Sequence, residues 1–207
     1  MPSTRYQKIN AHHYRHIWVV GDIHGEYQLL QSRLHQLSFF PEIDLLISVG
    51  DNIDRGPESL DVLRLLNQPW FTSVKGNHEA MALEAFETGD GNMWLASGGD
   101  WFFDLNDSEQ QEAIDLLLKF HHLPHIIEIT NDNIKYAIAH ADYPGSEYLF
   151  GKEIAESELL WPVDRVQKSL NGELQQINGA DYFIFGHMMF DNIQTFANQI
   201  YIDTGSP

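Results

Sequence analysis

Four short fragments carry oxygen- and nitrogen-bearing side chains that suit a metal centre: Gly21-Asp22-Ile23-His24-Gly25, Gly50-Asp51-Asn52-Ile53-Asp54-Arg55-Gly56, Gly76-Asn77-His78-Glu79 and His140-Ala141-Asp142. Glycines border the first three fragments, and glycine lets the backbone turn sharply around the polar side chains. Carboxylate, imidazole and amide groups are ligands for divalent ions, and the set contains no sulfur. The four fragments together predict one centre that holds two metal ions.

Each fragment follows an apolar run that is typical of a β-strand. The runs span residues 17–20, 45–49, 70–74 and 136–139. Between the first three runs, leucines recur at helical spacing at Leu30, Leu34 and Leu37, and again at Leu60, Leu63 and Leu66. Alternating strands and helices predict parallel neighbouring strands, whose carboxyl ends meet at one edge of the sheet, where sites form. We therefore expect the four fragments to lie together in space.

These fragments resemble the signature motifs of the metallophosphoesterases of the phosphoprotein phosphatase type. The resemblance is greatest to the small serine/threonine protein phosphatases of bacteria and bacteriophage lambda. It covers nearly the whole chain, including Gly98-Gly99-Asp100-Trp101-Phe102, Phe183-Ile184-Phe185-Gly186-His187 and Tyr201-Ile202-Asp203-Thr204-Gly205. It implies an α/β, calcineurin-like fold in which two packed β-sheets form a sandwich flanked by helices. At 207 residues, the chain is expected to form a single domain over residues 1–207.

The resemblance implies two divalent ions and six ligands. The implied ligands are Asp22, His24, Asp51, Asn77, His140 and His187. The carboxylate of Asp51 has two oxygens and would bridge the ions. Mixed oxygen and nitrogen ligands suit manganese, iron or zinc, and of these we expect manganese.

The implied reaction is the hydrolysis of phosphate monoesters, with phosphoserine and phosphothreonine in proteins as the expected substrates and phosphotyrosine as a further one. A hydroxide bridging the two ions would attack phosphorus in line. In the family, the histidine that matches His78 protonates the leaving oxygen, and the aspartate that matches Asp54 holds this histidine. An imidazole suits this role near neutral pH because its unperturbed pKa is about 6.5. Arg55 would bind two phosphate oxygens through its planar guanidinium.

Composition restricts the partners. The formal net charge of −18 repels nucleic acids and anionic lipids, so we expect neither as a partner. Two divalent ions and Arg55 would still give the site a local positive charge that attracts the phosphate of a phosphorylated protein or a small phosphoester. The absence of cysteine excludes disulfides and fits a reducing compartment. With no membrane-length apolar run and no signal-peptide core in Met1-Pro2-Ser3-Thr4-Arg5, we expect a cytoplasmic monomer.

Three features depart from the family pattern. Val163 stands where these phosphatases carry a second phosphate-binding arginine, and either Arg165 replaces that arginine or the contact is lost. Met188-Met189 follow His187 in place of the usual Thr-Pro, which predicts a reshaped loop. The sequence stops at Ser206-Pro207, where relatives continue into a further turn and strand; this position lies outside the residues that the structure describes.

Two other functions are alternatives. Symmetrical bis(5'-nucleosyl)-tetraphosphate hydrolases use the same metal motifs, but they need a nucleoside pocket and are usually longer chains. A catalytically impaired phosphate-binding protein would account for Val163, although every metal and acid residue is present. We expect Glu79 and Asp142 to support the site rather than bind metal, and Trp94 and Trp101 to pack mainly in the core.

Overall fold

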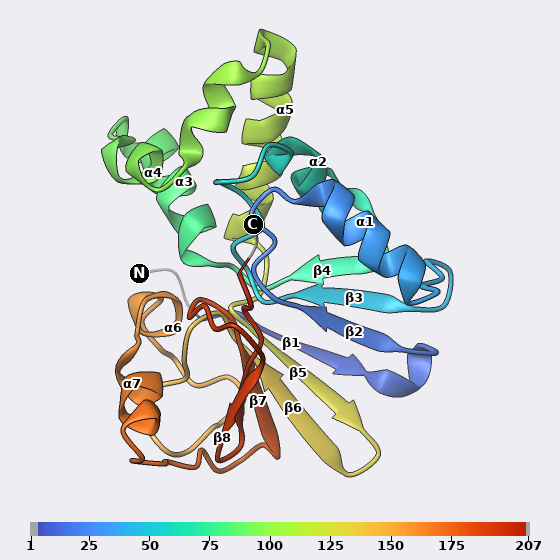
Figure 1. Ribbon diagram of the computed structural model, residues 1–207, viewed down its shortest axis with the longest axis vertical. Helices are drawn as coiled ribbons and strands as arrows, with labels where there is room; N and C mark the ends of the chain where they lie inside the picture. The colour runs from blue at the N-terminus through green and yellow to red at the C-terminus, as the bar shows by residue number, and fades with distance from the viewer. Residues whose placement is uncertain (1–3, 206–207) are drawn as a thin grey trace.

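The computed structural model describes residues 4–205, and two β-sheets form its centre (Figure 1). The smaller sheet contains three parallel strands: β2 (Ile17–Val20), β3 (Leu45–Ser48) and β4 (Phe71–Ser73). The helices that join these strands are α1 (Tyr27–Gln36) and α2 (Ser59–Arg64). The predicted alternation of strand and helix is confirmed.

The larger sheet contains six strands in the order β1-β5-β6-β7-β9-β8. Their bounds are β1 (Tyr6–Asn10), β5 (Ile126–Asn131), β6 (Ile134–Ile138), β7 (Tyr182–Phe185), β8 (Gln194–Phe196) and β9 (Gln199–Tyr201). Because β6, β7 and β9 are parallel, the loops that follow them leave the sheet at the same edge. These loops carry His140, His187 and Asp203.

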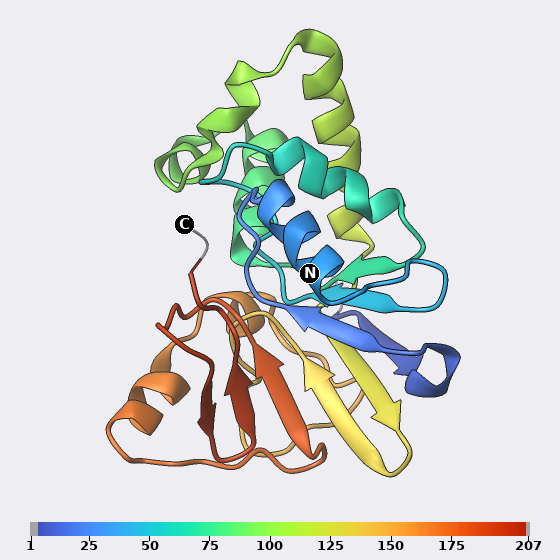
Figure 2. The same cartoon turned by 45° about the vertical axis from the view of Figure 1, so that its right-hand side comes forward.

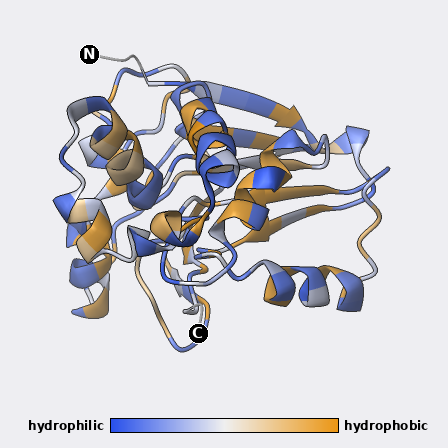
Figure 3. Ribbon diagram, turned by 90° about the horizontal axis from the view of Figure 1, so that it is seen from above, coloured by the Kyte–Doolittle hydropathy of each residue, from blue (hydrophilic) through white to orange (hydrophobic). Residues whose placement is uncertain are grey.

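The two sheets pack face to face through alternate residues of their strands. Leu45 and Ile47 of β3 share one buried cluster with Ile127 and Ile129 of β5. The intervening Leu46 faces the other way, into a cluster with the buried side of α1. This period of two follows from the geometry of a strand, and it buries β3 on both faces. In Figure 3, several strands are largely apolar, whereas the helices carry both apolar and polar residues.

Helices cover the outer faces of both sheets. Figure 2 shows the helices of residues 27–121 on one side of the smaller sheet and the larger sheet on the other side. The short helices α6 (Ser157–Leu160) and α7 (Asp164–Leu170) pack their buried residues against the outer face of the larger sheet. No helix within residues 4–205 is long and apolar enough to cross a membrane.

A helical cap follows β4. It consists of α3 (Asn77–Thr88), α4 (Asn92–Ala96), the 3₁₀ helix η3 (Gly99–Asp104), α5 (Asp107–Leu117) and the 3₁₀ helix η4 (Leu118–His121). Asn106 starts α5 by accepting hydrogen bonds from the backbone N–H groups of Ser108 (3.0 Å) and Glu109 (3.1 Å), as a capping box does. The cap shares an apolar core with α2, and this core includes Trp94, Trp101 and Phe102.

Leucine spacing predicted the first two helices, and the last leucine of each set lies beyond the end of its helix. The helix α1 ends at Gln36 and leaves Leu37 exposed, because Ser38 adopts a positive φ of 51° that ends the helical path. The helix α2 ends at Arg64, and Leu66 lies in the 3₁₀ turn η2 (Leu65–Asn67). Another 3₁₀ turn, η1 (Ala11–His13), joins β1 to the segment before β2.

Candidate metal and phosphate site

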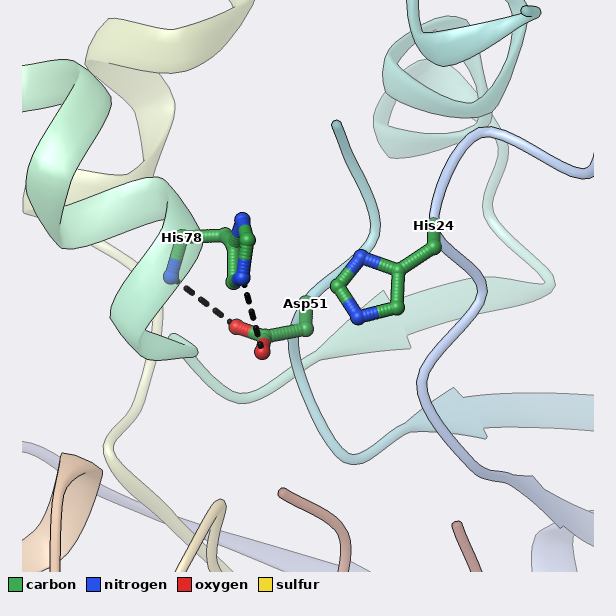
Figure 4. Close-up of side chains that lie close together, drawn as sticks. All are labelled: His24, Asp51 and His78. Carbon is green, nitrogen blue, oxygen red and sulfur yellow. Dashed lines mark hydrogen bonds and ion pairs between the residues drawn. The ribbon is translucent and has the colours of Figure 1, made fainter. Parts of the chain in front are cut away.

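Asp51 lies at the centre of the candidate site. One cluster consists of His24, Asp51 and His78, and a second consists of Asp51, His140 and His187. Within each cluster the ligating atoms all lie within 4.8 Å of one another. Figure 4 shows the Asp51 carboxylate between His24 and His78. Asp51 belongs to both clusters, as a bridging carboxylate must.

Asp22 and Asn77 complete the group of side chains. The Asp22 carboxylate accepts hydrogen bonds from the backbone N–H of His187 at 3.2 and 3.1 Å. The Asn77 Oδ1 atom lies 2.8 Å from Nε2 of His140 and 2.9 Å from Nδ1 of His187. The structure therefore brings together all six side chains that the sequence suggested as ligands, and their binding of metal stays a prediction.

Backbone carbonyls orient two of the imidazoles. The Nδ1 atom of His24 lies 2.9 Å from the Ile53 carbonyl oxygen, and Nδ1 of His140 lies 2.8 Å from the Val49 carbonyl oxygen. A ring nitrogen beside a carbonyl must be the donor, so Nε2 of each neutral ring carries the lone pair. This tautomer presents Nε2 to a metal ion, with the carbonyl as the supporting partner of the ring.

The site concentrates negative charge. Burial raises the pKa of Asp22 well above its ordinary value, and the neighbouring Asp51 charge raises it further. Burial alone would raise the pKa of Asp51. The nearby His140, and after it His78, outweigh the effect of burial and hold this pKa below its ordinary value. Two buried carboxylates that depend on nearby positive charge are the electrostatic pattern expected of a cation site.

The histidines respond to burial in two ways. Burial lowers the pKa of His24 and that of His187 to about 4, which keeps both rings neutral as ligands must be. Burial also acts to lower the pKa of His140, but the Asp51 carboxylate outweighs burial and raises this pKa to about 10. His140 must therefore lose a proton to serve as a ligand.

Backbone strain is concentrated at the site. Within residues 4–205, eight residues other than glycine have a positive φ, and five of them belong to the site: His24 (46°), Asp51 (50°), Asp54 (74°), Arg55 (67°) and His187 (65°). Such conformations cost about 1–3 kcal/mol each and persist only where surrounding contacts hold them. The loops are therefore held in place to present particular side chains.

Glu79 holds two of these loops together. Its fully buried carboxylate accepts backbone hydrogen bonds from Asp51 (3.1 Å), Asn52 (2.6 Å) and Gly76 (2.8 Å). A Cβ atom at Gly76 would lie 2.2 Å from Oδ1 of Asp51, so only glycine permits this close approach. Gly186 is under the same constraint, because a Cβ atom there would lie 2.1 Å from Oδ1 of Asp22.

His78 belongs to the first cluster, and it forms a buried pair with Asp54. Nδ1 of His78 lies 2.6 Å from Oδ2 of Asp54, and Asp54 is fully buried. Burial lowers the pKa of His78, but the hydrogen bond to Asp54 and the Asp51 charge outweigh burial and raise it above its ordinary value. The indole N–H groups of Trp94 and Trp101 donate to Oδ1 of Asp54 at 2.9 and 2.8 Å.

Sequence reasoning assigned these tryptophans mainly to the core and missed their contact with Asp54. Both are indeed buried, at 3% and 8% exposure. The signal that points to a second role is the indole N–H group, because a buried N–H requires an acceptor. The sequence does not reveal which acceptor that is.

Arg55 is exposed at the edge of the site, and its guanidinium reaches across it. The Nη1 atom lies 3.0 Å from Nε2 of His24, and Nη2 lies 3.2 Å from Nε2 of His78. Its backbone N–H donates to the Gly98 carbonyl at 3.1 Å. A phosphate that approaches from solvent would thus meet Arg55 beside the candidate metal ligands.

Arg165 makes its contacts within the fold. Its Nε atom donates to Oδ1 of Asp142 at 2.8 Å, and Nη2 donates to the carbonyl oxygens of Tyr143 (2.8 Å) and Gly145 (2.7 Å). Burial raises the pKa of Asp142, although the Arg165 charge opposes this effect. These contacts fix the loop after β6, and they account for the buried position of Arg165.

Comparison with known proteins identifies the family. Residues 15–190 match the sequence profile of the family described as "Calcineurin-like phosphoesterase". The chain belongs to this family. The resemblance inferred from the motifs is confirmed, and the family implies divalent metal ions, which the two carboxylate and histidine clusters suit.

Two relatives match along nearly their whole length. "Serine/threonine-protein phosphatase 2" of Salmonella typhimurium is 60% identical over 206 residues, which are 100% of this chain and 94% of the relative. "Serine/threonine-protein phosphatase 1" of the same organism is 45% identical over 205 residues, 99% of this chain and 93% of the relative. A symmetrical bis(5'-nucleosyl)-tetraphosphatase of Erwinia tasmaniensis is 33% identical over 126 residues, 60% of this chain and 43% of the relative.

A solved structure confirms the predicted fold. The crystal structure of a putative diadenosine tetraphosphatase superposes with a TM-score of 0.69 and covers 97% of this chain and 88% of that chain. Its sequence identity is 23%, so this likeness concerns the fold alone. Two sheets flanked by helices are the expected α/β architecture.

Proposed function

We propose that this protein is a metal-dependent phosphatase that hydrolyses phosphoserine and phosphothreonine in proteins, with phosphotyrosine as a further substrate. The observation that carries the proposal is the guanidinium of Arg55, which lies within hydrogen-bond distance of both His24 and His78 at the first cluster. The 60% identity to a protein named serine/threonine-protein phosphatase supports the choice of substrate class.

The proposed metal ligands are the six side chains grouped around Asp51. One ion would be held by Asp22, His24 and Asp51, and the other by Asp51 with Asn77, His140 and His187. We infer manganese as the metal, because mixed oxygen and nitrogen ligands suit it, with iron or zinc as the alternatives. When bound, the two ions stabilise negative charge on the phosphoryl group and lower the pKa of a water molecule.

The other side chains have complementary tasks. Arg55 binds oxygens of the phosphoryl group through its exposed guanidinium. His78 donates a proton from Nε2 to the leaving oxygen, since its Nδ1 is engaged by Asp54 and its Nε2 lies on the side of the ring where Arg55 would bind the phosphoryl group. A serine or threonine alkoxide is a poor leaving group, so this proton transfer matters most for the proposed substrates.

The charge of the chain favours a phosphomonoester over a dinucleotide. A formal net charge of −18 repels a tetraphosphate bridge more strongly than a single phosphoryl group. The tetraphosphatase relative also matches only 60% of this chain. The proposal further includes a single catalytic domain that acts as a monomer in the cytoplasm, and the cysteine-free sequence fits that reducing compartment.

A substrate panel tests the proposed function. With manganese added, we expect turnover of phosphoserine and phosphothreonine peptides, loss of turnover with a chelator, and recovery when manganese is restored. Specificity is measured as the ratio of kcat/KM values, with a symmetrical dinucleoside tetraphosphate as the competitor. A ratio that favours the dinucleotide would identify a tetraphosphatase. Metal-loaded protein that binds phosphate but turns over no ester would identify a binding protein.

Val163→Arg is predicted to tighten phosphate binding. Val163 lies two residues after Trp161, whose backbone acts to raise the pKa of His187 and is therefore close to that ring. A well-formed contact between an arginine and phosphate contributes about 1.5–3 kcal/mol, which is roughly a 10–150-fold decrease in Kd. The measurement is the Kd of inorganic phosphate by calorimetry on metal-loaded protein.

Arg165→Ala is the companion variant. Because Arg165 contacts Asp142 and two backbone carbonyls, its loss should lower the free energy of unfolding by about 3–5 kcal/mol. The Kd of phosphate should stay close to that of the wild type. A folded Arg165→Ala variant that loses phosphate affinity as severely as Arg55→Ala, or a Val163→Arg variant without effect, would contradict this assignment.

A further inference from the structure

Trp94 and Trp101 belong to the helical cap, and both contact Asp54 in the loop after β3. Trp94 lies in α4 and Trp101 in η3, and their indole N–H groups both donate to Oδ1 of Asp54, at 2.9 and 2.8 Å. The other oxygen, Oδ2, lies 2.6 Å from Nδ1 of His78. Each oxygen of the Asp54 carboxylate thus has its own partners: Oδ1 accepts from the two indoles, and Oδ2 contacts the histidine.

Asp54 depends on these donors because it has no access to solvent. A carboxylate in an apolar environment is tolerated only when hydrogen bonds replace its hydration. Without the indoles, Oδ1 would lose both of these partners. The carboxylate could then turn, and Oδ2 would no longer be confined to the position that Nδ1 of His78 requires.

Packing fixes the two indoles. The rings of Trp94 and Trp101 meet edge to face, with centroids 6.3 Å apart and an interplanar angle of 83°. Trp94 also packs edge-on against Phe86, with centroids 5.4 Å apart. Gly99 allows the chain to pass close to Trp94, since a Cβ atom at Gly99 would lie 2.5 Å from its ring. The donors are therefore held in place before a substrate arrives.

The loop that carries Asp54 needs outside support. Asp54 and Arg55 have positive φ angles of 74° and 67°, a region that residues other than glycine rarely adopt. The backbone N–H of Asp54 donates to Oγ of Ser59 at 2.9 Å, and that of Arg55 donates to the Gly98 carbonyl at 3.1 Å. Gly98 lies between the two tryptophans in sequence. One segment of the cap therefore binds the carboxylate of Asp54 and the backbone N–H of Arg55.

We propose that Trp94 and Trp101 are positioning residues of the reaction, whose indole N–H groups hold the Asp54 carboxylate so that His78 stays directed at the leaving oxygen. This inference rests on the proposed function, because it assigns a purpose to the orientation of His78. The hydrogen bonds themselves are properties of the fold and can be tested without any substrate.

The kinetic test uses Trp94→Phe, Trp101→Phe and the double variant, which keep an aromatic ring and remove the N–H group. Trp18→Phe is the matched control, because the Trp18 indole N–H has no hydrogen-bond partner within the described part of the chain. We expect the double variant to lose about 10–100-fold in kcat for phenyl phosphate, with KM nearly unchanged. The loss should be smaller for 4-nitrophenyl phosphate, whose leaving group needs less protonation. The control should match the wild type.

A spectroscopic test is independent of activity. In metal-free and zinc-loaded protein, the Nδ1 proton of His78 should give a downfield proton resonance, identified by its loss in His78→Asn. It should persist in Trp18→Phe and exchange rapidly or vanish in the double variant. If the wild type hydrolyses no phosphoester, the proposed function is wrong, while this resonance still decides whether the tryptophans position His78.

Two results would overturn the inference. One is a double variant that keeps the His78 resonance and the wild-type dependence on leaving group. The other is an equal loss of kcat for both aryl phosphates, which indicates a general structural defect. If the double variant fails to fold, the single variants decide the question by the same two measurements, because each removes only one of the two donors.

Discussion

Asp51→Asn is expected to abolish hydrolysis and to reduce the metal content from two ions per chain to one or none. Asp51 is shared by both clusters, and asparagine removes its charge and one of its two anionic oxygens. Bound ions contribute several kcal/mol to stabilising transition-state charge, so kcat should fall by more than about 10⁴-fold when both are lost. Elemental analysis and steady-state kinetics on the same preparation measure the two effects.

Asp44→Asn is the matched control for this experiment. Asp44 is also a buried aspartate, but it pairs with Arg15 outside both clusters. This variant should lose stability while keeping two ions and the wild-type kcat. Retention of two ions by Asp51→Asn, or an equal loss of metal in the control, would show that Asp51 is not the shared ligand.

His78→Asn is expected to lower kcat by about 10²–10⁴-fold for phosphoserine peptides and phenyl phosphate, because general acid catalysis typically contributes this much. The effect on 4-nitrophenyl phosphate should be smaller, since its leaving group needs little protonation. Metal content should stay near two ions, because the contact of residue 78 with Asp51 includes a backbone N–H at 3.0 Å, which the substitution leaves in place.

His125→Asn provides the corresponding control. His125 is likewise buried, but it contacts Glu156 at 3.0 Å outside the two clusters. Its replacement should change stability and leave the dependence on leaving group as in the wild type. If His78→Asn slows both kinds of substrate equally, or removes the metal ions, His78 does not act as the general acid.

The sequence pattern predicted the smaller sheet and its helices because that pattern is local, whereas the packing of a second sheet was implied by the family resemblance. Strands such as β3 are short apolar runs, and the helices between them show leucines at helical spacing. Alternating strands and helices form parallel neighbours, so the loops after β2, β3 and β4 were expected at one edge. Helix ends were less predictable, because a single positive φ at Ser38 ends the turn after α1 and leucine spacing does not contain that information.

The candidate ligands were also predictable from the sequence, since each sits within a fragment of characteristic residues. The alternation of strands and helices predicted that the first three fragments meet, whereas His140 and His187 follow strands of the larger sheet and join them because the two sheets pack together. The chemical type of the centre followed from the donor atoms, because carboxylates and imidazoles without thiolates suit a limited group of metals. The net charge of −18 likewise argued against polyanionic partners without any structure.

Only the tertiary structure decided which side chains support the site. Trp94 and Trp101 lie 40 and 47 residues from Asp54, and their contacts depend on how the cap folds back over the loop after β3. Arg165 and Val163 are two residues apart, yet Arg165 binds Asp142 while Val163 packs against an apolar cluster on the larger sheet, and spacing alone does not give these contacts. Residue types and spacing determine which groups are present, whereas hydrogen-bond partners far apart in sequence are determined by the path of the chain in space.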